Sequence, residues 1–219
     1  AAIAFTFSTL AGSPGTVVNS QDGSGAAAQF DAPRGVAVDR TGTVYVADTT
    51  NNTIRRIAAS GEVVTLAGTP GQEGFTNGTG AAARFNEPFG LAVDDAGTLF
   101  VADASNNAIR KVTAGGVVST LAGGGGAGSN DGTGAAARLD EPRGVALDTG
   151  GTVYVADYDN HLIRKITADG VVTTLAGQAD QPGNADGVGS TASFRGAMGI
   201  AVDAAGVVYV AYTGNRAIR

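Results

Sequence analysis

The chain has 219 residues, of which 43% are hydrophobic and 16% charged, and it contains 35 glycines and no cysteine. The lack of cysteine excludes a disulfide framework and thiolate chemistry. The formal net charge of −6, from 14 basic and 20 acidic residues, gives no electrostatic reason to expect nucleic acid or an anionic membrane as a partner. No apolar run approaches the length of a membrane span.

One motif, Pro-x-Gly followed by an apolar residue, Ala, another apolar residue and Asp, divides the chain at regular intervals. Its copies begin at Pro33, Pro88 and Pro142, and at Ala197, where Ala replaces the proline. A fixed period of this size indicates a stacked-repeat architecture. We therefore expect a single domain over residues 1–219 that is built from four similar units.

Each copy contains the same sequence of short segments. In the first copy these are an apolar strand, a turn, a β-branched strand, a polar turn, an alternating strand, a third turn and a final strand, at residues 35–39, 40–42, 43–48, 49–52, 53–57, 59–62 and 63–67. Four antiparallel strands per repeat are typical of one propeller blade. The predicted fold class is therefore an all-β propeller.

A long connector precedes each copy of the motif, and its copies resemble one another. Each combines a glycine-rich half with Ala-Ala-Ala, as at residues 22–30 and 77–85. We expect the first half to form a turn and the second a single helical turn that places an apolar residue in a hydrophobic seat. The residues concerned are Phe30, Phe85, Leu139 and Phe194.

The two ends of the chain complement each other. Residues 5–12 align with the fourth strand of a repeat, as at 171–177, whereas residues 215–219 align with a third strand, as at 160–164. We expect a closing strand within residues 1–12 to complete the C-terminal blade, which would remove exposed sheet edges. A four-bladed monomer is the preferred arrangement, and an eight-bladed ring of two chains is the alternative.

The repeated Pro-x-Gly motif, the Gly-x-Val-Tyr-Val-Ala-Asp strand at 151–157 and the Asn-x-x-Ile-Arg-Lys-Ile pattern, best seen at 160–166, resemble NHL-repeat β-propellers. The long connector is similar to the bacterial and teneurin-like variety of that repeat. The resemblance covers essentially the whole chain. It implies a propeller, but members of the family range from protein and RNA binding platforms to a few lyases. They typically close with six blades or more, whereas this chain has four copies.

The candidate binding surface is the face on which the connectors meet the turns that follow each second strand, because both lie at the same end of an antiparallel blade. Two sets of residues are expected there. The first consists of the residues that follow the proline position: Arg34, Phe89, Arg143 and Met198. The second belongs to the turns: Asp48, Asp103, Asp157, Tyr158 and Tyr212.

The three turn aspartates have two interpretations. Carboxylate oxygens suit calcium, but the same side chains also hold turns by accepting backbone hydrogen bonds. The second is preferred, because Tyr212 replaces Asp in the fourth copy. We therefore expect no metal site and no cofactor, with calcium as the alternative. His161 is the only histidine, so sites that need several imidazoles are excluded, and we expect a solvated turn residue there.

The sequence favours a non-enzymatic scaffold that binds a protein or peptide through this face, with no assigned catalytic residue. Two alternatives stay open. One is a lyase or hydrolase with a divalent cation at the mouth of the central channel, using Asp48, Asp103, Asp157 and Tyr212. The other is a purely structural module. We expect the chain to belong to a larger bacterial protein; an extracytoplasmic location is compatible with this, but the sequence leaves the location open.

Overall fold

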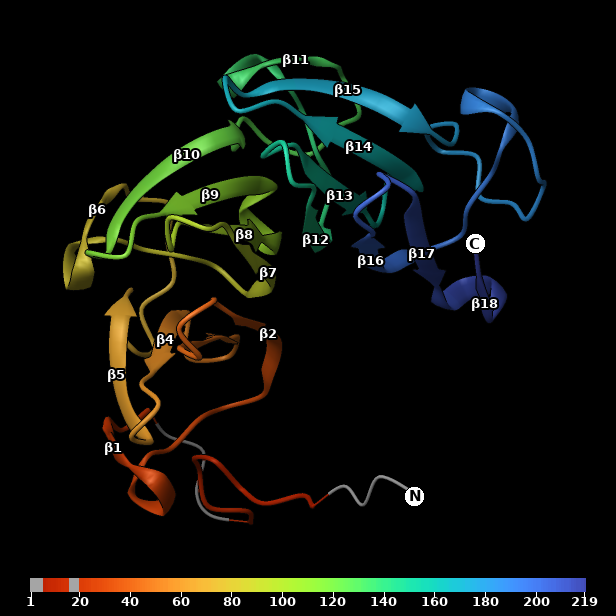
Figure 1. Ribbon diagram of the computed structural model, residues 1–219. Coiled ribbons are helices and arrows are strands. Elements are labelled where there is room, and N and C mark those ends of the chain that lie inside the picture. Colours follow the sequence, from red (N-terminus) through yellow and green to blue (C-terminus); the bar gives the residue numbers. More distant parts are fainter. Residues whose placement is uncertain (1–5, 16–19) are drawn as a thin grey trace.

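The structure is a computed structural model that describes residues 6–15 and 20–219. Four antiparallel sheets follow one another around an arc, each forming one blade (Figure 1). The all-β propeller architecture predicted from the sequence is confirmed, and the described residues contain no α-helix, only short 3₁₀ turns. None of the helical segments in this part of the chain has the length and hydropathy needed to cross a bilayer.

The blades share one strand order, counted from the inner side of the arc outward. The first blade consists of β2 (Pro33–Val38), β3 (Val44–Asp48), β4 (Thr53–Ile57), β5 (Glu62–Ala67) and β1 (Gly23–Ser24). The second consists of β7 (Pro88–Val93), β8 (Leu99–Asp103), β9 (Ala108–Val112), β10 (Val117–Gly123) and β6 (Gly78–Thr79). The third consists of β12 (Pro142–Leu147), β13 (Val153–Asp157), β14 (Leu162–Ile166), β15 (Val171–Ala176) and β11 (Gly132–Thr133). The fourth has only the inner part of this order, namely β16 (Ala197–Val202), β17 (Val208–Tyr212) and β18 (Ala217–Ile218), within the described residues.

The turn between the two inner strands of each blade is held by its aspartate. In the first blade the Asp39 carboxylate accepts hydrogen bonds from the backbone N–H groups of Thr41 (2.8 Å) and Thr43 (3.0 Å). Gly42 completes the turn with a φ of 85°, in the left-handed region that favours glycine. The tight turn predicted at residues 40–42 is therefore confirmed.

The connectors form more regular structure than the sequence suggested. Their glycine-rich halves supply the short strands β1, β6 and β11, each paired with the outermost long strand of its blade. These blades therefore have five strands rather than the predicted four, because the connector satisfies its backbone groups by joining the sheet. The predicted helical turns are present as 3₁₀ turns at Gly25–Ala27, Gly80–Ala82, Gly134–Ala136 and Gly189–Thr191.

The core lies between successive blades. Between the first and second blades, Tyr45 and Ile54 pack against Leu99 and Val101, with Phe85 beside them. The predicted hydrophobic seat is confirmed: Phe85, Leu139 and Phe194 are buried and Phe30 is half-buried. Because each blade covers only its neighbours, the core is a series of similar interfaces around the arc.

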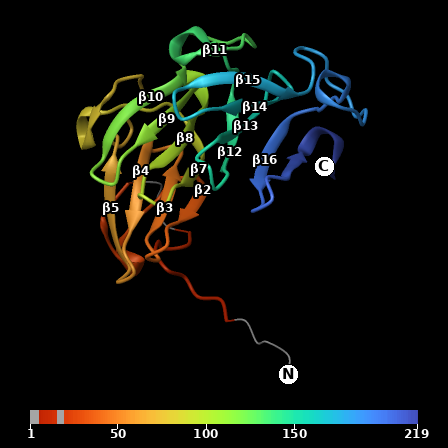
Figure 2. The ribbon, with the colours of Figure 1, turned by 45° about the horizontal axis from the view of Figure 1, so that its top comes forward.

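The structure does not show the predicted closure of the ring. In the described part of the predicted closing strand, residues 9–12 lie against the first blade, and Gly12 donates a backbone hydrogen bond to Gly25 (3.0 Å). β18 pairs only with β17 within the described residues, and the first and fourth blades lie at opposite ends of an open arc (Figures 1 and 2). Residues 1–5 lie outside the described residues.

Candidate binding face

The turns and connectors meet on one face of the arc, as the sequence predicted. Backbone hydrogen bonds join each turn after the second strand to the connector of the same blade. They run from Thr50 to Asp31 (3.2 Å), from Ala104 to Glu87 (3.3 Å), from Asp159 to Asp140 (3.2 Å) and from Thr213 to Gly196 (3.1 Å). We call this surface the connector face.

A β-bulge at the start of each inner strand brings the residue after the proline position onto this face. In the first blade Pro33 pairs with Asp48 and Gly35 with Ala47, so Arg34 has no partner in the ladder. A register shift at the same place occurs in the other three blades. A bulged residue is re-aimed away from the sheet, which explains why this position can carry Arg, Phe or Met.

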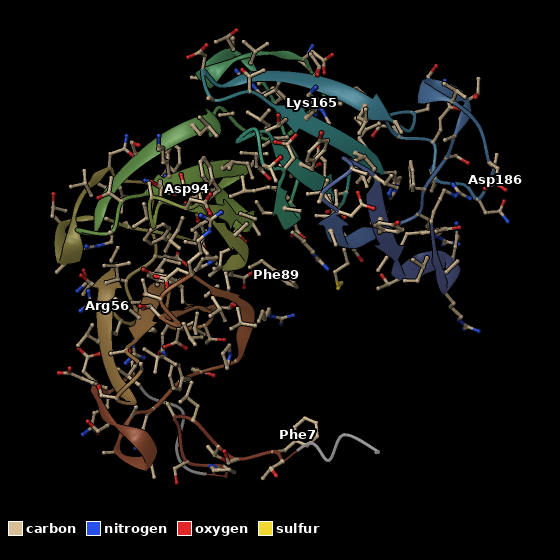
Figure 3. The ribbon with its side chains drawn as sticks, in the orientation of Figure 1. Phe7, Arg56, Phe89, Asp94, Lys165 and Asp186 are labelled. Carbon is tan, nitrogen blue, oxygen red and sulfur yellow. The ribbon has the colours of Figure 1, made fainter. Side chains whose placement is uncertain are left out.

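Four side chains from the first three blades form an alternating stack, which we call the arginine–aromatic stack: Arg34, Phe89, Arg143 and Tyr158. The guanidinium carbon of Arg34 lies 4.9 Å from the centre of the Phe89 ring, and that of Arg143 lies 5.4 Å from the same ring. Arg143 also lies 3.5 Å from the centre of the Tyr158 ring. Phe89 is on the inner side of the arc (Figure 3). These distances are those of cation–π interactions.

The structure thus brings together four of the residues predicted for the site. Met198, which was also expected on the connector face, is half-buried at the corresponding position of the fourth blade, where the equivalent bulge occurs. The stack itself was not foreseen, because the side chains come from repeats about 55 residues apart and meet only when the blades curve together.

Two glutamates at the stack were not predicted as site residues. Glu87 and Glu141 precede the prolines of the second and third blades and have φ values of 52° and 45°. This left-handed conformation is unusual for such residues and most often marks a position held by its surroundings. Asn52 and Asn107 supply that support, because their side-chain oxygens accept hydrogen bonds from the Glu87 and Glu141 N–H groups, each at 2.8 Å. The pre-proline position is the signal that could have indicated these residues.

The two glutamates and three residues of the stack, Arg34, Phe89 and Arg143, line a small cavity of about 90 Å³. Glu141 accepts an ion-paired hydrogen bond from Arg143 (2.7 Å), whereas Glu87 accepts a hydrogen bond from the Ser105 hydroxyl (3.1 Å). Within the described residues no carboxylate pairs with Arg34, which is exposed. The connector face therefore presents an unpaired guanidinium beside an aromatic ring.

The turn aspartates lie inside the blades and not on the connector face. Asp48, Asp103 and Asp157 are fully buried, and each binds the arginine of the neighbouring strand at 2.7–2.8 Å. Burial raises the pKa of Asp103 and that of Asp157 to about 6, although the arginine, a backbone N–H and an asparagine amide all stabilise each charge. These carboxylates hold the blade together and have no surface that a ligand could contact. The spacing of the repeats places these aspartates in the turns but does not predict that their side chains are buried.

The fourth blade replaces this ion pair with aromatic packing. Tyr212, at the Asp position, is buried and meets the Phe194 ring edge-on at a centroid separation of 5.9 Å. Arg219 stacks on both rings, at 5.0 Å from Tyr212 and 5.3 Å from Phe194. The alternative enzyme hypothesis used these turn residues as its polar groups, and the structure places all four side chains inside the blades.

His161 contacts the backbone of its own turn and of the next connector. It is half-buried, its φ of 59° matches that of Asn52 and Asn107, and its Nδ1 lies 3.1 Å from the Tyr158 carbonyl oxygen and 3.4 Å from the Gly196 nitrogen. It therefore occupies the position from which the two asparagines bridge to the next blade. Residues 6–15 and 20–219 contain no group of three His, Cys, Asp or Glu side chains arranged to hold a metal ion.

Comparison with known proteins agrees with this architecture. The NHL repeat family matches residues 30–57, 85–112 and 139–166, which span the inner strands of the first three blades. The protein is an NHL-repeat β-propeller. Each matched segment of this propeller begins at the buried apolar residue of its connector and ends with its third strand.

Two curated relatives and one solved structure illustrate the likeness. NHL repeat-containing protein 2 of Homo sapiens is 32% identical over 173 residues, which cover 73% of this chain and 24% of that protein. Protein SUPPRESSOR OF QUENCHING 1 of Arabidopsis thaliana is 41% identical over 92 residues, which cover 42% of this chain and 9% of that protein. An auxiliary nutrient binding protein from Bacteroides thetaiotaomicron superposes with a TM-score of 0.69 at 20% identity, covering 88% of this chain and 48% of that one.

The propeller spans less than half the length of these relatives. Its structural neighbours also include a streptogramin B lyase and a gluconolactonase, with TM-scores of 0.54 and 0.55. Their sequence identities of 14% and 16% show a shared fold alone.

Proposed function

We propose that this NHL propeller is a binding scaffold, without catalytic activity of its own, whose connector face holds an acidic segment of a protein or peptide. The observation that carries the proposal is the arginine–aromatic stack on the connector face. Arg34 supplies a cation that pairs with no carboxylate in the described part of the chain. A rigid array of blades supports the stack, which suits recognition without large rearrangement.

The chemistry of the stack favours carboxylates together with aromatic groups. Arginine presents a planar fork of donors that matches a carboxylate, and its face packs on aromatic rings. Phe89 and Tyr158 already hold Arg143 in this way, so its guanidinium is pre-organised. Little side-chain entropy is then lost on binding. Because the chain as a whole carries a net negative charge, it repels acidic molecules in general. Only an acidic segment that fits the local cationic surface at the stack should therefore bind.

A synthetic peptide in which Glu alternates with Tyr is a direct probe, and the same peptide with Lys in place of Glu is its control. We expect fluorescence anisotropy to show binding of the Glu peptide only. Arg34→Ala or Arg143→Ala should weaken that binding about tenfold, the loss expected for one hydrogen bond to a charged group. Added salt should weaken it further.

Arg40→Ala is the matched control variant. Arg40 is an exposed arginine at the opposite end of the blade, paired with Asp95 at 2.7 Å. Its removal should leave binding unchanged. Equal affinity for the Lys peptide, or equal weakening by Arg40→Ala and Arg34→Ala, would show that the stack does not recognise the acidic segment.

A further inference from the structure

Each blade holds one residue in the left-handed backbone conformation directly before its proline position. The φ values lie between 45° and 63°, and the four residues are Ala32, Glu87, Glu141 and Gly196. Because the backbone is alike in all four blades, a side chain at this position starts from a similar place relative to the bulged residue two positions later. Only the third blade has a glutamate at the first position and an arginine at the second, namely Glu141 and Arg143.

The carboxylate of Glu141 occupies the arginine of its own blade. Its Oε2 accepts an ion-paired hydrogen bond from Arg143 Nη2 at 2.7 Å. Tyr158 stacks on the same guanidinium at 3.5 Å, so a carboxylate reaches Arg143 at its N–H edge rather than across its face. Glu141 already lies at that edge. A carboxylate of the chain itself therefore holds the position that a carboxylate of a bound acidic segment would take.

This ion pair is more open than the pairs inside the blades. The side chains of Arg143 and Glu141 are 21% and 37% exposed, whereas those of Arg164 and Asp157 are both 0% exposed. A partly exposed pair contributes little to stability, because water solvates both charges when they separate. A ligand can therefore displace the Glu141 carboxylate without leaving a buried charge uncompensated, which is not true of Asp157.

The backbone of Glu141, by contrast, is fixed. Its N–H donates a hydrogen bond to the Asn107 side-chain oxygen of the second blade at 2.8 Å. When the Glu141 side chain turns away from Arg143, its charge therefore stays within a few residues' reach of the guanidinium. Two like charges at such short separation repel each other measurably even when water surrounds them. Glu141 thus opposes an incoming carboxylate both by occupying the guanidinium and by repulsion.

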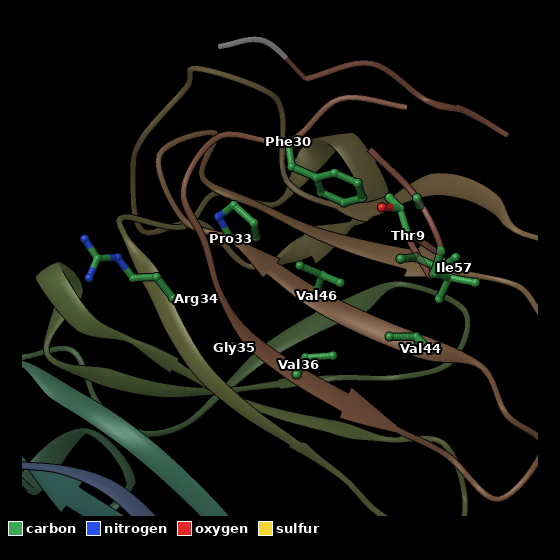
Figure 4. A pocket seen from close by; sticks show the side chains of 11 residues that line it. Thr9, Phe30, Pro33, Arg34, Gly35, Val36, Val44, Val46 and Ile57 are labelled. Atoms are coloured by element: carbon green, nitrogen blue, oxygen red, sulfur yellow. The ribbon is translucent and has the colours of Figure 1, made fainter. Parts of the chain in front are cut away.

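The arginine of the first blade has no such neighbour. Ala32 takes the position of Glu141 and carries no charge. Arg34 projects away from the apolar side chains of its own repeat, such as Phe30 and Val46 (Figure 4). The two arginines of the arginine–aromatic stack therefore differ in whether their own repeat supplies a carboxylate two residues earlier.

We propose that Glu141 is an internal competitor of the acidic segment, and that the residue before the proline sets how strongly the arginine after it binds a carboxylate. This inference rests on the function proposed above and adds its specificity-determining residue. An acidic side chain that binds Arg143 must displace Glu141, whereas one that binds Arg34 displaces no carboxylate from position 32. The connector face therefore has a stronger carboxylate site at Arg34 and a weaker one at Arg143.

Glu141→Gln tests the proposal, because glutamine keeps the length of the side chain and removes its charge. Fluorescence anisotropy should show about tenfold tighter binding of the Glu peptide, the effect of removing one like charge next to the ligand carboxylate. Glu62→Gln removes the same charge from an exposed residue of β5 and should leave the affinity unchanged. Glu87→Gln should give a smaller gain than Glu141→Gln, because Glu87 accepts its hydrogen bond from the Ser105 hydroxyl and not from a guanidinium.

A double variant shows whether the effect passes through Arg143. Most of the gain from Glu141→Gln should disappear in an Arg143→Ala background, because no guanidinium is then left beside position 141 to receive the ligand carboxylate. An undiminished gain in that background would overturn the proposal. Equal gains from Glu141→Gln and Glu87→Gln would overturn it as well, because they would show an effect of charge alone.

The reciprocal variant introduces a competitor where the chain has none. Ala32→Glu should weaken binding of the Glu peptide about tenfold by supplying Arg34 with a carboxylate two residues earlier. The left-handed backbone at residue 32 accepts this side chain, since Glu87 and Glu141 adopt φ values of 52° and 45° there. Ala32→Gln has the same size without the charge and should weaken binding much less. Equal affinities of these two variants would contradict the proposal.

Chemical labelling gives a readout that needs no ligand. Phenylglyoxal modifies accessible arginines, and mass spectrometry of the digested protein measures the rate at each site. Arg143 should react faster in Glu141→Gln than in the wild type, and an unchanged rate would overturn the proposal. If the wild type binds the Glu peptide and Glu141→Gln does not tighten it, this inference fails while the proposed function stands. If neither protein binds the peptide, the proposed function fails, and the labelling rate of Arg143 then decides whether Glu141 covers the guanidinium.

Discussion

Arg110 is the residue whose replacement tests the internal architecture most severely. It is fully buried in β9, and it joins its blade to the connector. Its guanidinium donates to the Asp103 carboxylate (2.7 Å), the Arg84 carbonyl (3.0 Å), the Thr76 carbonyl (3.1 Å) and the Asn77 side chain (2.8 Å). Arg110→Met preserves the unbranched aliphatic part of the side chain but removes the charge and all four hydrogen bonds.

The loss in the free energy of unfolding follows from the carboxylate that remains in the core. Asp103 stays fully buried with its charge no longer compensated, and breaking such a pair by removing one partner costs about 3–5 kcal/mol. The free energy of unfolding of a typical domain is about 5–15 kcal/mol, so Arg110→Met should remove a large part of the stability. Urea unfolding followed by circular dichroism measures it. Lys111→Met, the next position in the same strand, should change the free energy of unfolding by less than about 0.5 kcal/mol.

A double variant separates the charge from the packing. Adding Asp103→Asn to Arg110→Met removes the uncompensated carboxylate, so the double variant should be more stable than Arg110→Met alone. If Arg110→Met costs no more than Lys111→Met, the buried pair does not stabilise the blade. If the double variant is the less stable of the two, an uncompensated charge is not the cause of the loss.

Three further predictions concern other parts of the core. Gly90→Ala should destabilise the propeller by about 1–3 kcal/mol, because the added Cβ would collide with the backbone of the next blade. Gly115→Ala should have a much smaller effect, because its Cβ would meet nothing closer than 3.9 Å. Equal losses of stability in the two variants would contradict the close approach of the inner strands at Gly90. The pKa values of Asp103 and Asp157 are raised to about 6 from 3.8, so the native state binds more protons than the unfolded state between these values. Stability from these groups therefore rises as the pH falls from 7 to 5, by about 1 kcal/mol per carboxyl, and Asp157→Asn should reduce the rise measured by urea unfolding. Phe85→Ala should cost about 3–5 kcal/mol by opening a cavity in a fully buried seat, and a loss below about 1 kcal/mol in thermal or urea unfolding would refute that role.

Features that depend on local residue pattern were predictable from the sequence. The strands and their hairpins follow from short apolar, β-branched and alternating segments separated by turns, and the turn at residues 40–42 follows from an aspartate that binds the backbone and a glycine with positive φ. The buried apolar residue of each connector was also predictable, because Phe85 and its equivalents recur at the same place in every copy.

The candidate site was predictable only in part. The position after the proline was expected on the connector face, and Arg34, Phe89 and Arg143 do meet there. The turn aspartates were placed on the same face, but their side chains turn inward toward an arginine of the neighbouring strand. For example, the Asp103 carboxylate in β8 binds the Arg110 guanidinium in β9, the strand with which β8 pairs.

The sequence by itself determined the four long strands of a blade and the turns that join them, but not the short fifth strand that the connector adds. Only the tertiary structure decided that residues 9–12 lie on the first blade and that, within the described residues, β18 pairs with β17 alone. The reason is physical. A blade is built from contacts between residues close in sequence, whereas closure depends on the curvature that accumulates over several interblade interfaces, and no local residue pattern encodes that sum.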